Sequence, residues 1–228
     1  MEATDAMTWL REERRLRRAL DEAVRCVCAF LHNDPRGYLG VSWGKDSVVV
    51  LAVVAMAVRE HGLRLPAAWV RVDRRENPDC PAVRDAARAG YAAGVDYHEI
   101  DVVAGDTSGE KLTSQRGFDE AARRWGARHV SGVRAAESRA RKMRDLVHGT
   151  TSANTCAPLS RWSTADVFTV AYGLGLPLHP AYAMTFGGRL DRQHLRVASI
   201  GGARGVEMGR REWERLYYRD VLDAVGVR

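Results

Sequence analysis

The chain has 228 residues, of which 46% are hydrophobic and 28% charged, and its formal net charge is +6. The longest apolar run, residues 48–58, is too short to cross a bilayer, and no secretory signal pattern opens the chain. The four cysteines match neither a disulfide framework nor a Cys-x-x-Cys metal pair. These features exclude an integral membrane protein and a disulfide-stabilised secreted domain, and they predict a cytoplasmic globular protein with no membrane partner.

Segments of helical periodicity alternate along the chain with short apolar segments of strand length. The first helical pattern ends at a turn rich in Asn, Asp, Pro and Gly. Repeated strand–helix units predict an α/β fold with a doubly wound, mostly parallel sheet and helices on both faces, in which ligands bind beyond the carboxyl ends of the strands. We expect helices over residues 7–31, 47–61, 80–93, 117–125, 137–147 and 207–225, and strands over residues 38–42, 67–72, 97–103 and 128–132.

These elements divide the chain into three expected regions. An N-terminal helical segment, residues 1–36, precedes an α/β core, residues 37–150. A C-terminal extension of helices and loops, residues 151–228, is expected to pack on the core. Its two Gly-Gly pairs, in segments 185–192 and 196–205, lie among arginines. They predict either loops that close over an anion or flexible surface connections.

The segment Ser42-Trp-Gly-Lys-Asp-Ser47, here called the phosphate loop, joins the first expected strand to an apolar helix. The first amides of a helix lack intrahelical partners and its dipole attracts negative charge, so a loop with a lysine at this point predicts a phosphate site. Its glycine spacing is not that of a Walker A loop, and no G-x-G-x-x-G fingerprint occurs. The alternative is an ordinary turn whose Ser and Asp cap the helix.

A second polar segment, Ser131-Gly-Val-Arg-Ala-Ala-Glu-Ser-Arg-Ala-Arg141, follows the fourth expected strand and therefore lies at the same edge of the sheet. Gly132 would let the backbone approach a ligand closely. Arg134 can bind a phosphate or sulfate with a planar bidentate fork. Glu137 would begin a helix with a basic face, which can equally be a solvated surface helix.

Both segments resemble known nucleotide-binding motifs. The phosphate loop resembles the Ser-Gly-Gly-x-Asp-Ser loop of the PP-loop ATP pyrophosphatases, the adenine nucleotide alpha-hydrolase-like superfamily, with Trp43 in place of the first glycine. The segment Gly-Val-Arg-x-x-Glu-Ser-x-x-Arg, ending at Arg141, is similar to that of the phosphoadenosine phosphosulfate (PAPS) reductase-like branch. Segments 157–168 and 176–182 also resemble that branch, in the same order.

The resemblance implies an enzyme that cleaves ATP between the α and β phosphates, with Mg²⁺ expected. Lys45 would stabilise the pyrophosphate, and Arg134 would contact the α phosphate or an anionic acceptor. Asp46 would orient the loop or hold Mg²⁺, Asp73 would meet the ribose or a metal-bound water, and the Trp43 indole would either shift the loop or stack on the ligand. The expected catalytic residues are Lys45, Asp46 and Arg134. The expected nucleotide-binding residues are Ser42, Trp43, Gly44, Lys45, Asp46, Ser47, Asp73, Gly132, Arg134, Glu137 and Arg141.

The resemblance leaves the reaction open. PAPS reductases use a cysteine in a C-terminal Glu-Cys-Gly-x-His segment, whereas this chain has no cysteine after Cys156. The paired cysteines that bind a 4Fe–4S cluster in related reductases are also missing, so we expect no iron–sulfur cluster. Three hypotheses follow: an adenylylating enzyme acting in sulfur transfer or in nucleoside or nucleic-acid modification, a sulfonucleotide (PAPS/APS) reductase that uses Cys156, and a non-catalytic nucleotide-binding subunit of a nucleic-acid-modifying complex.

The expected partners are an adenine nucleotide and an acceptor that the sequence does not identify. Dense groups of arginine fit a polyanionic partner, so nucleic acid is a further candidate, although no nucleic-acid-binding motif accompanies them. The alternative is a general arginine bias of the sequence. Assembly into a homo-oligomer is left open.

Overall fold

The computed structural model describes residues 2–72, 74–91, 94–103, 110–185, 187–197, 199–202 and 209–227. Within these residues five strands form one sheet, in the order β3-β2-β1-β4-β5, and every neighbouring pair is parallel. The strands are β1 (Tyr38–Val41), β2 (Leu65–Val72), β3 (Val95–Val102), β4 (His129–Val130) and β5 (Thr155–Cys156). The doubly wound α/β class expected from the alternating pattern is confirmed.

The helices follow the strands in the order that a wound sheet requires. Short 3₁₀ turns join several of them, and two of these turns, η1 and η2, lie close to the site described below. The α-helices are α1 (Glu2–Asn33), α2 (Lys45–His61), α3 (Cys80–Tyr91), α4 (Glu110–Trp125), α5 (Arg139–His148), α6 (Thr164–Gly173), α7 (Arg210–Tyr217) and α8 (Arg219–Ala224). The 3₁₀ turns are η1 (Ala135–Glu137), η2 (Pro180–Ala183) and η3 (Arg192–His194).

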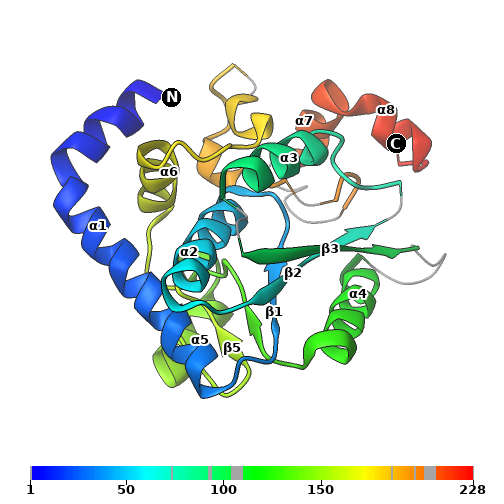
Figure 1. Ribbon diagram of the computed structural model, residues 1–228. Coiled ribbons are helices and arrows are strands. Elements are labelled where there is room, and N and C mark those ends of the chain that lie inside the picture. The colour runs from blue at the N-terminus through cyan, green and yellow to red at the C-terminus, as the bar shows by residue number, and fades with distance from the viewer. Residues whose placement is uncertain are drawn as a thin grey trace.

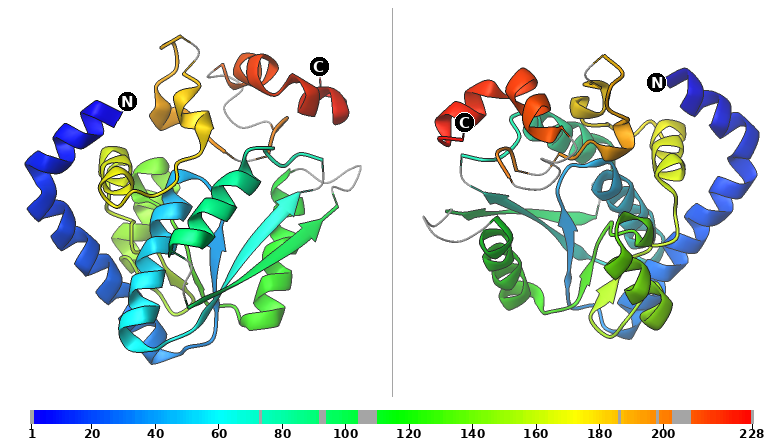
Figure 2. Two further views of the ribbon diagram at one scale, coloured as in Figure 1. Left: turned by 45° about the horizontal axis from the view of Figure 1, so that its top comes forward. Right: turned by 180° about the vertical axis from the view of Figure 1, so that it is seen from behind.

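Helices cover both faces of the sheet, and alternate residues of β2 divide between two hydrophobic clusters (Figures 1 and 2). Leu65, Ala67 and Trp69 belong to the larger cluster, which includes α1, α2 and α6. Ala68 belongs to a smaller cluster under α4. Successive side chains of a strand point to opposite faces of the sheet, and in β2 both faces are covered by hydrophobic clusters. For this reason the sequence of β2 is an almost continuous apolar run and does not alternate between apolar and polar residues.

The long helix α1 lies along one side of the molecule and packs against α2 and α6 (Figure 1). Close approach to α6 depends on Gly173, where a Cβ atom would lie 2.3 Å from the Trp9 ring. Ser163 caps the other end of α6 by accepting a hydrogen bond from the Asp166 amide at 3.0 Å. This packing fixes the start of α6 at the edge of the candidate site.

Some expected boundaries were wrong for identifiable reasons. Gly117 was taken as a helix start but lies inside α4. A Cβ atom there would come within 2.2 Å of Val70, so glycine at this position serves the close packing of α4 on β2 and does not mark a helix end. The short strand β5 was not predicted, since two residues carry no period. It places a strand of the sheet beyond residue 150. The helix expected from residue 207 begins at Arg210, and residue 207 itself lies outside the described residues.

Candidate functional site

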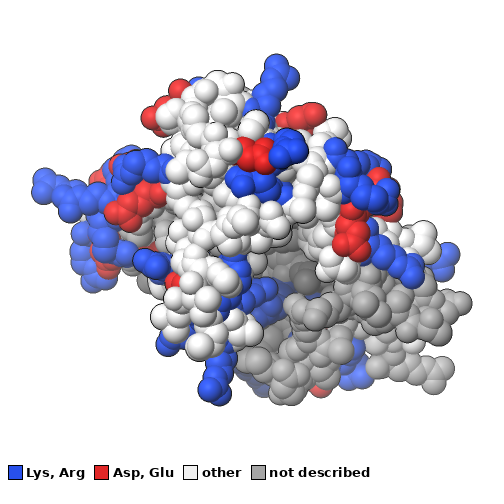
Figure 3. Space-filling view, turned by 90° about the horizontal axis from the view of Figure 1, so that it is seen from below, with Lys and Arg blue, Asp and Glu red and all other residues white. Residues whose placement is uncertain are grey.

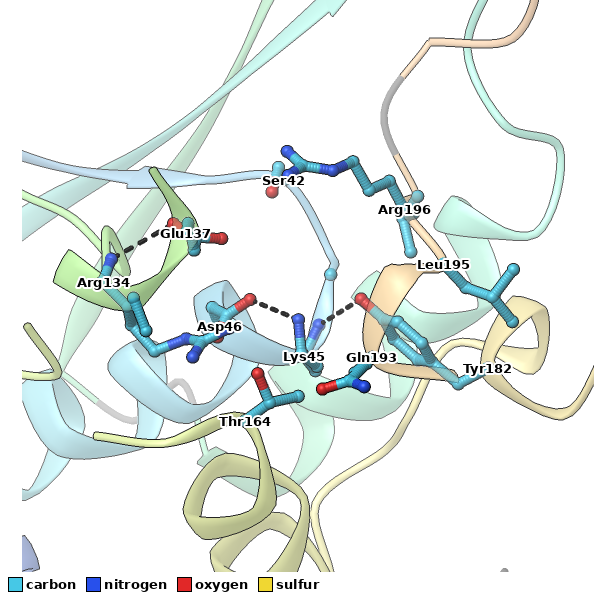
Figure 4. A pocket seen from close by; sticks show the side chains of 13 residues that line it. Ser42, Lys45, Asp46, Arg134, Glu137, Thr164, Tyr182, Gln193, Leu195 and Arg196 are labelled. Carbon is cyan, nitrogen blue, oxygen red and sulfur yellow. Dashed lines mark hydrogen bonds and ion pairs between the residues drawn. The ribbon is translucent and has the colours of Figure 1, made fainter. Parts of the chain in front are cut away.

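A cavity of about 320 Å³ opens at the carboxyl edge of β1 and β4 (Figure 4). Four parts of the chain build it: the phosphate loop with the start of α2, the η1 turn, the start of α6, and the segment from η2 to just beyond η3. Its lining residues are Ser42, Gly44, Lys45, Asp46, Arg134, Ala136, Glu137, Thr164, Tyr182, Gln193, Leu195, Arg196 and Val197. The two polar segments singled out in the sequence therefore meet in one cavity, at the edge of the sheet where α/β proteins bind ligands.

The phosphate loop leads directly into the N-terminus of α2. Gly44 is the N-cap of α2 and offers no side-chain hydrogen bond, and the helix begins at Lys45. The Lys45 amide donates to the Tyr182 hydroxyl at 3.0 Å. The Ser47 hydroxyl accepts from the Ser42 amide at 3.1 Å and donates to the Gly44 carbonyl at 3.0 Å. Ser47 thus closes the loop from inside and does not line the cavity, whereas Ser42 is exposed on it.

Asp46 connects the two cationic side chains that were expected to bind phosphate. Its carboxylate accepts from Lys45 Nζ at 2.8 Å and from Arg134 Nε at 2.6 Å. The Lys45 and Arg134 side chains are only 6% and 2% exposed, so both charges are held in a largely water-excluded place where electrostatic interactions are strong. Asp46 therefore holds the two cationic side chains in place, and the role in orienting the loop that was expected for it stays a prediction.

The same geometry argues against Asp46 as a magnesium ligand. Each carboxylate oxygen already contacts a cation, Oδ2 with Lys45 and Oδ1 with Arg134. Among the described residues, no group of three or more His, Cys, Asp or Glu side chains could hold a metal ion. Mg²⁺ prefers carboxylate and phosphate oxygens in near-octahedral geometry. Mg²⁺ is commonly held by one or two carboxylates together with substrate phosphates, so Mg²⁺ stays a prediction, and we assign no step to that ion.

Trp43 does not stack on a ligand as one of the two expectations had it. Its indole is 1% exposed and packs in the core, 5.8 Å from the ring of Trp69 and 5.6 Å from that of Tyr97. Its backbone adopts a φ of +58°, in the left-handed region that glycine favours. The loop thus keeps the turn of a glycine, and the large side chain is directed away from the cavity. Trp43 contributes core packing and loop shape.

Gly132 packs against the loop, and no ligand is needed to explain it. A Cβ atom at Gly132 would lie 2.7 Å from the carbonyl oxygen of Asp46, so glycine lets the end of β4 approach the first turn of α2. Glu137 lines the cavity, accepts from the Arg134 amide at 3.2 Å and pairs with the Arg141 guanidinium. Arg141 contacts Glu137 and does not itself line the cavity, so its expected part in nucleotide binding stays a prediction. Asp73 lies outside the described residues.

Several lining residues were not assigned from the sequence. Tyr182 ends the Leu-Pro-x-x-Pro-x-Tyr-like segment that carried part of the resemblance, and its contact with the Lys45 amide gives that segment a physical role. Burial raises the pKa of the Tyr182 hydroxyl, so the group stays protonated and can donate to a ligand oxygen. Thr164 lies in segment 157–168, one of the segments that carried the resemblance, although no role was expected for it. Gln193 lies between the two arginine-rich Gly-Gly segments and Arg196 begins the second, and no other pattern pointed to them.

Cys156 is placed away from the cavity. It lies in β5, is 0% exposed, and its Sγ is 3.7 Å from Sγ of Cys26 in α1. The hydrogen bond with Cys26 and burial raise the pKa of the Cys156 thiol. A buried, protonated thiol outside the site is a poor nucleophile.

Much of the positive charge is paired locally. In α1, Arg15 contacts Glu12 at 2.6 Å and Arg17 contacts Glu13 at 2.8 Å. On the face drawn in Figure 3, the described basic side chains lie in several separate groups, many of them beside acidic ones. On this face the described basic side chains form no continuous stripe, and nucleic acid as a partner stays a prediction. No helix among the described residues combines the length and apolarity needed to span a bilayer.

No protein-family model matches the sequence, and no curated protein matches it. Solved structures do match. PAPS reductase from Candida auris, in its phosphate complex, is 12% identical with a TM-score of 0.51, over 73% of this chain and 85% of that one. NMN synthetase from Francisella tularensis is 14% identical with a TM-score of 0.53, over 88% of this chain and 85% of that one.

A third similar structure is the FMN adenylyltransferase of Candida glabrata, in complex with FAD and inorganic pyrophosphate. It is 15% identical with a TM-score of 0.54, over 74% of this chain and 61% of that one. At such identities the likeness concerns the fold. Together with the parallel wound sheet, it shows that this chain has the adenine nucleotide alpha-hydrolase-like fold.

Proposed function

We propose that the cavity binds the phosphates of an adenine nucleotide and that the protein cleaves ATP between the α and β phosphates, transferring AMP to an acceptor. One observation carries the proposal: Lys45 at the N-terminus of α2, the buried Arg134 and the Tyr182 hydroxyl all meet in the cavity at the carboxyl edge of the sheet. Helix amides, a fixed lysine and a fixed arginine form an environment that favours phosphate.

The geometry supplies the main requirements of phosphoryl chemistry, which are positioning and charge stabilisation. Lys45, the Ser42 hydroxyl and the loop amides would hold the β and γ phosphates, and Arg134 the α phosphate. An acceptor atom would attack the α phosphorus in line. The bond from that phosphorus to the bridging oxygen breaks, and the electron pair leaves with pyrophosphate. Asp46 keeps both cations in place before the nucleotide arrives.

The similar structures are compatible with this reaction at the level of fold. The FMN adenylyltransferase structure holds FAD and inorganic pyrophosphate, and the PAPS reductase structure holds phosphate. The sulfonucleotide reductase alternative has less support, because the buried Cys156 does not line the cavity. The acceptor, whether a small sulfur or nitrogen nucleophile or a nucleic acid, is part of the proposal to be tested.

The experiment is turnover of α-labelled ATP with Mg²⁺ and a panel of acceptors: nucleosides, RNA, DNA, carboxylates and sulfur donors. We expect labelled AMP or an AMP adduct and one pyrophosphate per turnover. Lys45→Gln should abolish both, while Lys142→Gln, the same change on the exposed face of α5, should retain them. Nucleotide binding without product for any acceptor would indicate a non-catalytic module. Sulfite release from a sulfonucleotide that is lost in Cys156→Ala would revive the reductase.

A further inference from the structure

An ion pair beside the cavity joins the N-terminal helix α1 to the turn η3. Asp5, near the start of α1, accepts two hydrogen bonds from Arg192, at 2.6 and 2.5 Å. The Asp5 side chain is 6% exposed and that of Arg192 is 21% exposed. Two parallel charge-assisted hydrogen bonds in a shielded place are specific in geometry and little screened by salt. The pair therefore fixes the segment around η3 to the N-terminal helix.

Arg192 is also coupled to the phosphate loop through one aromatic ring. Its Cζ lies 4.0 Å from the ring centroid of Phe168, which is 1% exposed in α6. The Nζ atom of Lys45 lies 5.8 Å from the same ring. Cations over an aromatic face are attracted by its quadrupole, more strongly where water is excluded. A displacement of Arg192 would thus reach Lys45 through a single buried side chain.

The residues that directly follow Arg192 line the cavity. We name residues 192–197 the wall segment; within it Gln193, Leu195, Arg196 and Val197 face the cavity. The wall segment also lies against the loop, because a Cβ atom on Gly44 would be 3.9 Å from Cβ of Val197. The Asp5–Arg192 pair is therefore an anchor at the beginning of one wall of the cavity.

Arg196 is the charged side chain of the wall segment that lines the cavity. It is exposed, and no ion pair links it to any other described residue, whereas Lys45 and Arg134 already share Asp46. In Figure 4 its side chain extends from the wall segment in the direction of Ser42, the start of the phosphate loop. An arginine in this position can form bidentate hydrogen bonds to phosphate oxygens on the side of the cavity opposite Lys45.

We infer that the wall segment completes the polyphosphate site: Arg196 binds the β and γ phosphates of the nucleotide, and the Asp5–Arg192 pair positions it. This inference rests on the proposed function and deepens it by assigning the pyrophosphate end of the ligand to Arg196. The N-terminal helix, far from the loop in sequence, thereby contributes to the nucleotide site without touching the nucleotide.

The test is calorimetric titration of the full chain with ATP, inorganic pyrophosphate and AMP. Loss of a charge-assisted phosphate contact should weaken ATP and pyrophosphate by about tenfold or more in Arg196→Gln. AMP affinity should change by less than about twofold, and Arg196→Lys should restore part of the loss. Asp5→Asn should weaken the same two ligands by a smaller factor. Glu13→Gln, the same change in an ion pair on the surface of α1, should weaken none.

The outcomes separate the two proposals. If the wild type binds neither ATP nor pyrophosphate, the proposed function fails, and this inference fails with it. If the wild type binds both and Arg196→Gln binds them equally well, the inference alone is overturned. Arg196 is exposed, so its variants should fold normally. Asp5 is buried, so a thermal melt of Asp5→Asn is recorded first, and the titration is done at a temperature at which this variant is folded. Equal loss of AMP and pyrophosphate affinity in Arg196→Gln would also contradict the assignment to the pyrophosphate end.

Discussion

Replacing Asp46 by Asn tests the ion-pair arrangement at the centre of the cavity. The change leaves Lys45 and Arg134, with side chains 6% and 2% exposed, without the carboxylate that each contacts. Breaking a buried pair by removing one partner costs about 3–5 kcal/mol. Asp46 is itself 18% exposed, and Asn retains an oxygen that can accept one hydrogen bond, so we expect the lower end, about 3 kcal/mol.

The expected loss can be converted into an observable. An unfolding entropy of about 2.1 cal/mol/K per residue over 228 residues is about 0.5 kcal/mol/K, so 3 kcal/mol corresponds to about 6 °C in Tm. Urea unfolding followed by tryptophan fluorescence and by circular dichroism measures the same loss. Asp85→Asn, which removes an exposed partner of Arg84, is the matched control and should not move the midpoint resolvably.

Pyrophosphate should return part of the stability of Asp46→Asn, because the anion replaces the lost carboxylate between the two cations. If Asp46→Asn unfolds at the same urea concentration as the wild type, Lys45 and Arg134 do not depend on the carboxylate. The reasoning about how the cavity is preorganised would then be wrong.

Three further predictions concern the loop and its surroundings. Trp43→Gly should relieve about 1 kcal/mol of left-handed strain but lose more from the emptied core site, a net loss of about 3 kcal/mol in urea unfolding; a stabilised variant would contradict this. Tyr182→Phe removes the hydroxyl that accepts the hydrogen bond of the Lys45 amide, and should lower the free energy of unfolding by about 1–2 kcal/mol in the same assay. An unchanged free energy of unfolding would show that the amide has another hydrogen-bond partner. Burial lowers the pKa of His179 to about 4, so below its ordinary value of 6.5 the unfolded chain binds a proton that the folded chain does not. Stability should therefore fall by up to about 3 kcal/mol as pH drops from 7 to 4, and His179→Asn should flatten that part of the pH profile.

The order of the elements was predictable because hydrophobic periodicity reports burial directly. The buried strands and the apolar helix α2 follow from residues that must leave water, and the position of the phosphate loop follows from the topology of a parallel sheet. Boundaries were less predictable where tertiary packing decides. Gly117 looked like a helix start in isolation, and only its contact with Val70 explains why it lies inside α4.

The site was predictable where chemistry and placement agree, and unpredictable where contacts cross the chain. Lys45, Asp46, Arg134 and Glu137 lie where strand ends place them. The indole of Trp43 was open to two readings, because the sequence does not say which side of the loop the core occupies. Contacts such as Asp5–Arg192 join residues 187 positions apart, and no local pattern encodes them.

The most direct test of the central claim is equilibrium binding of ATP to the wild type and to Lys45→Gln, with AMP as the comparison ligand. If the phosphate loop holds the β and γ phosphates, the wild type binds ATP and the variant loses about 30-fold or more in ATP affinity while binding AMP almost unchanged. Absence of ATP binding by the wild type, or equal ATP affinity in the two proteins, would contradict the assignment of this cavity as a nucleotide phosphate site.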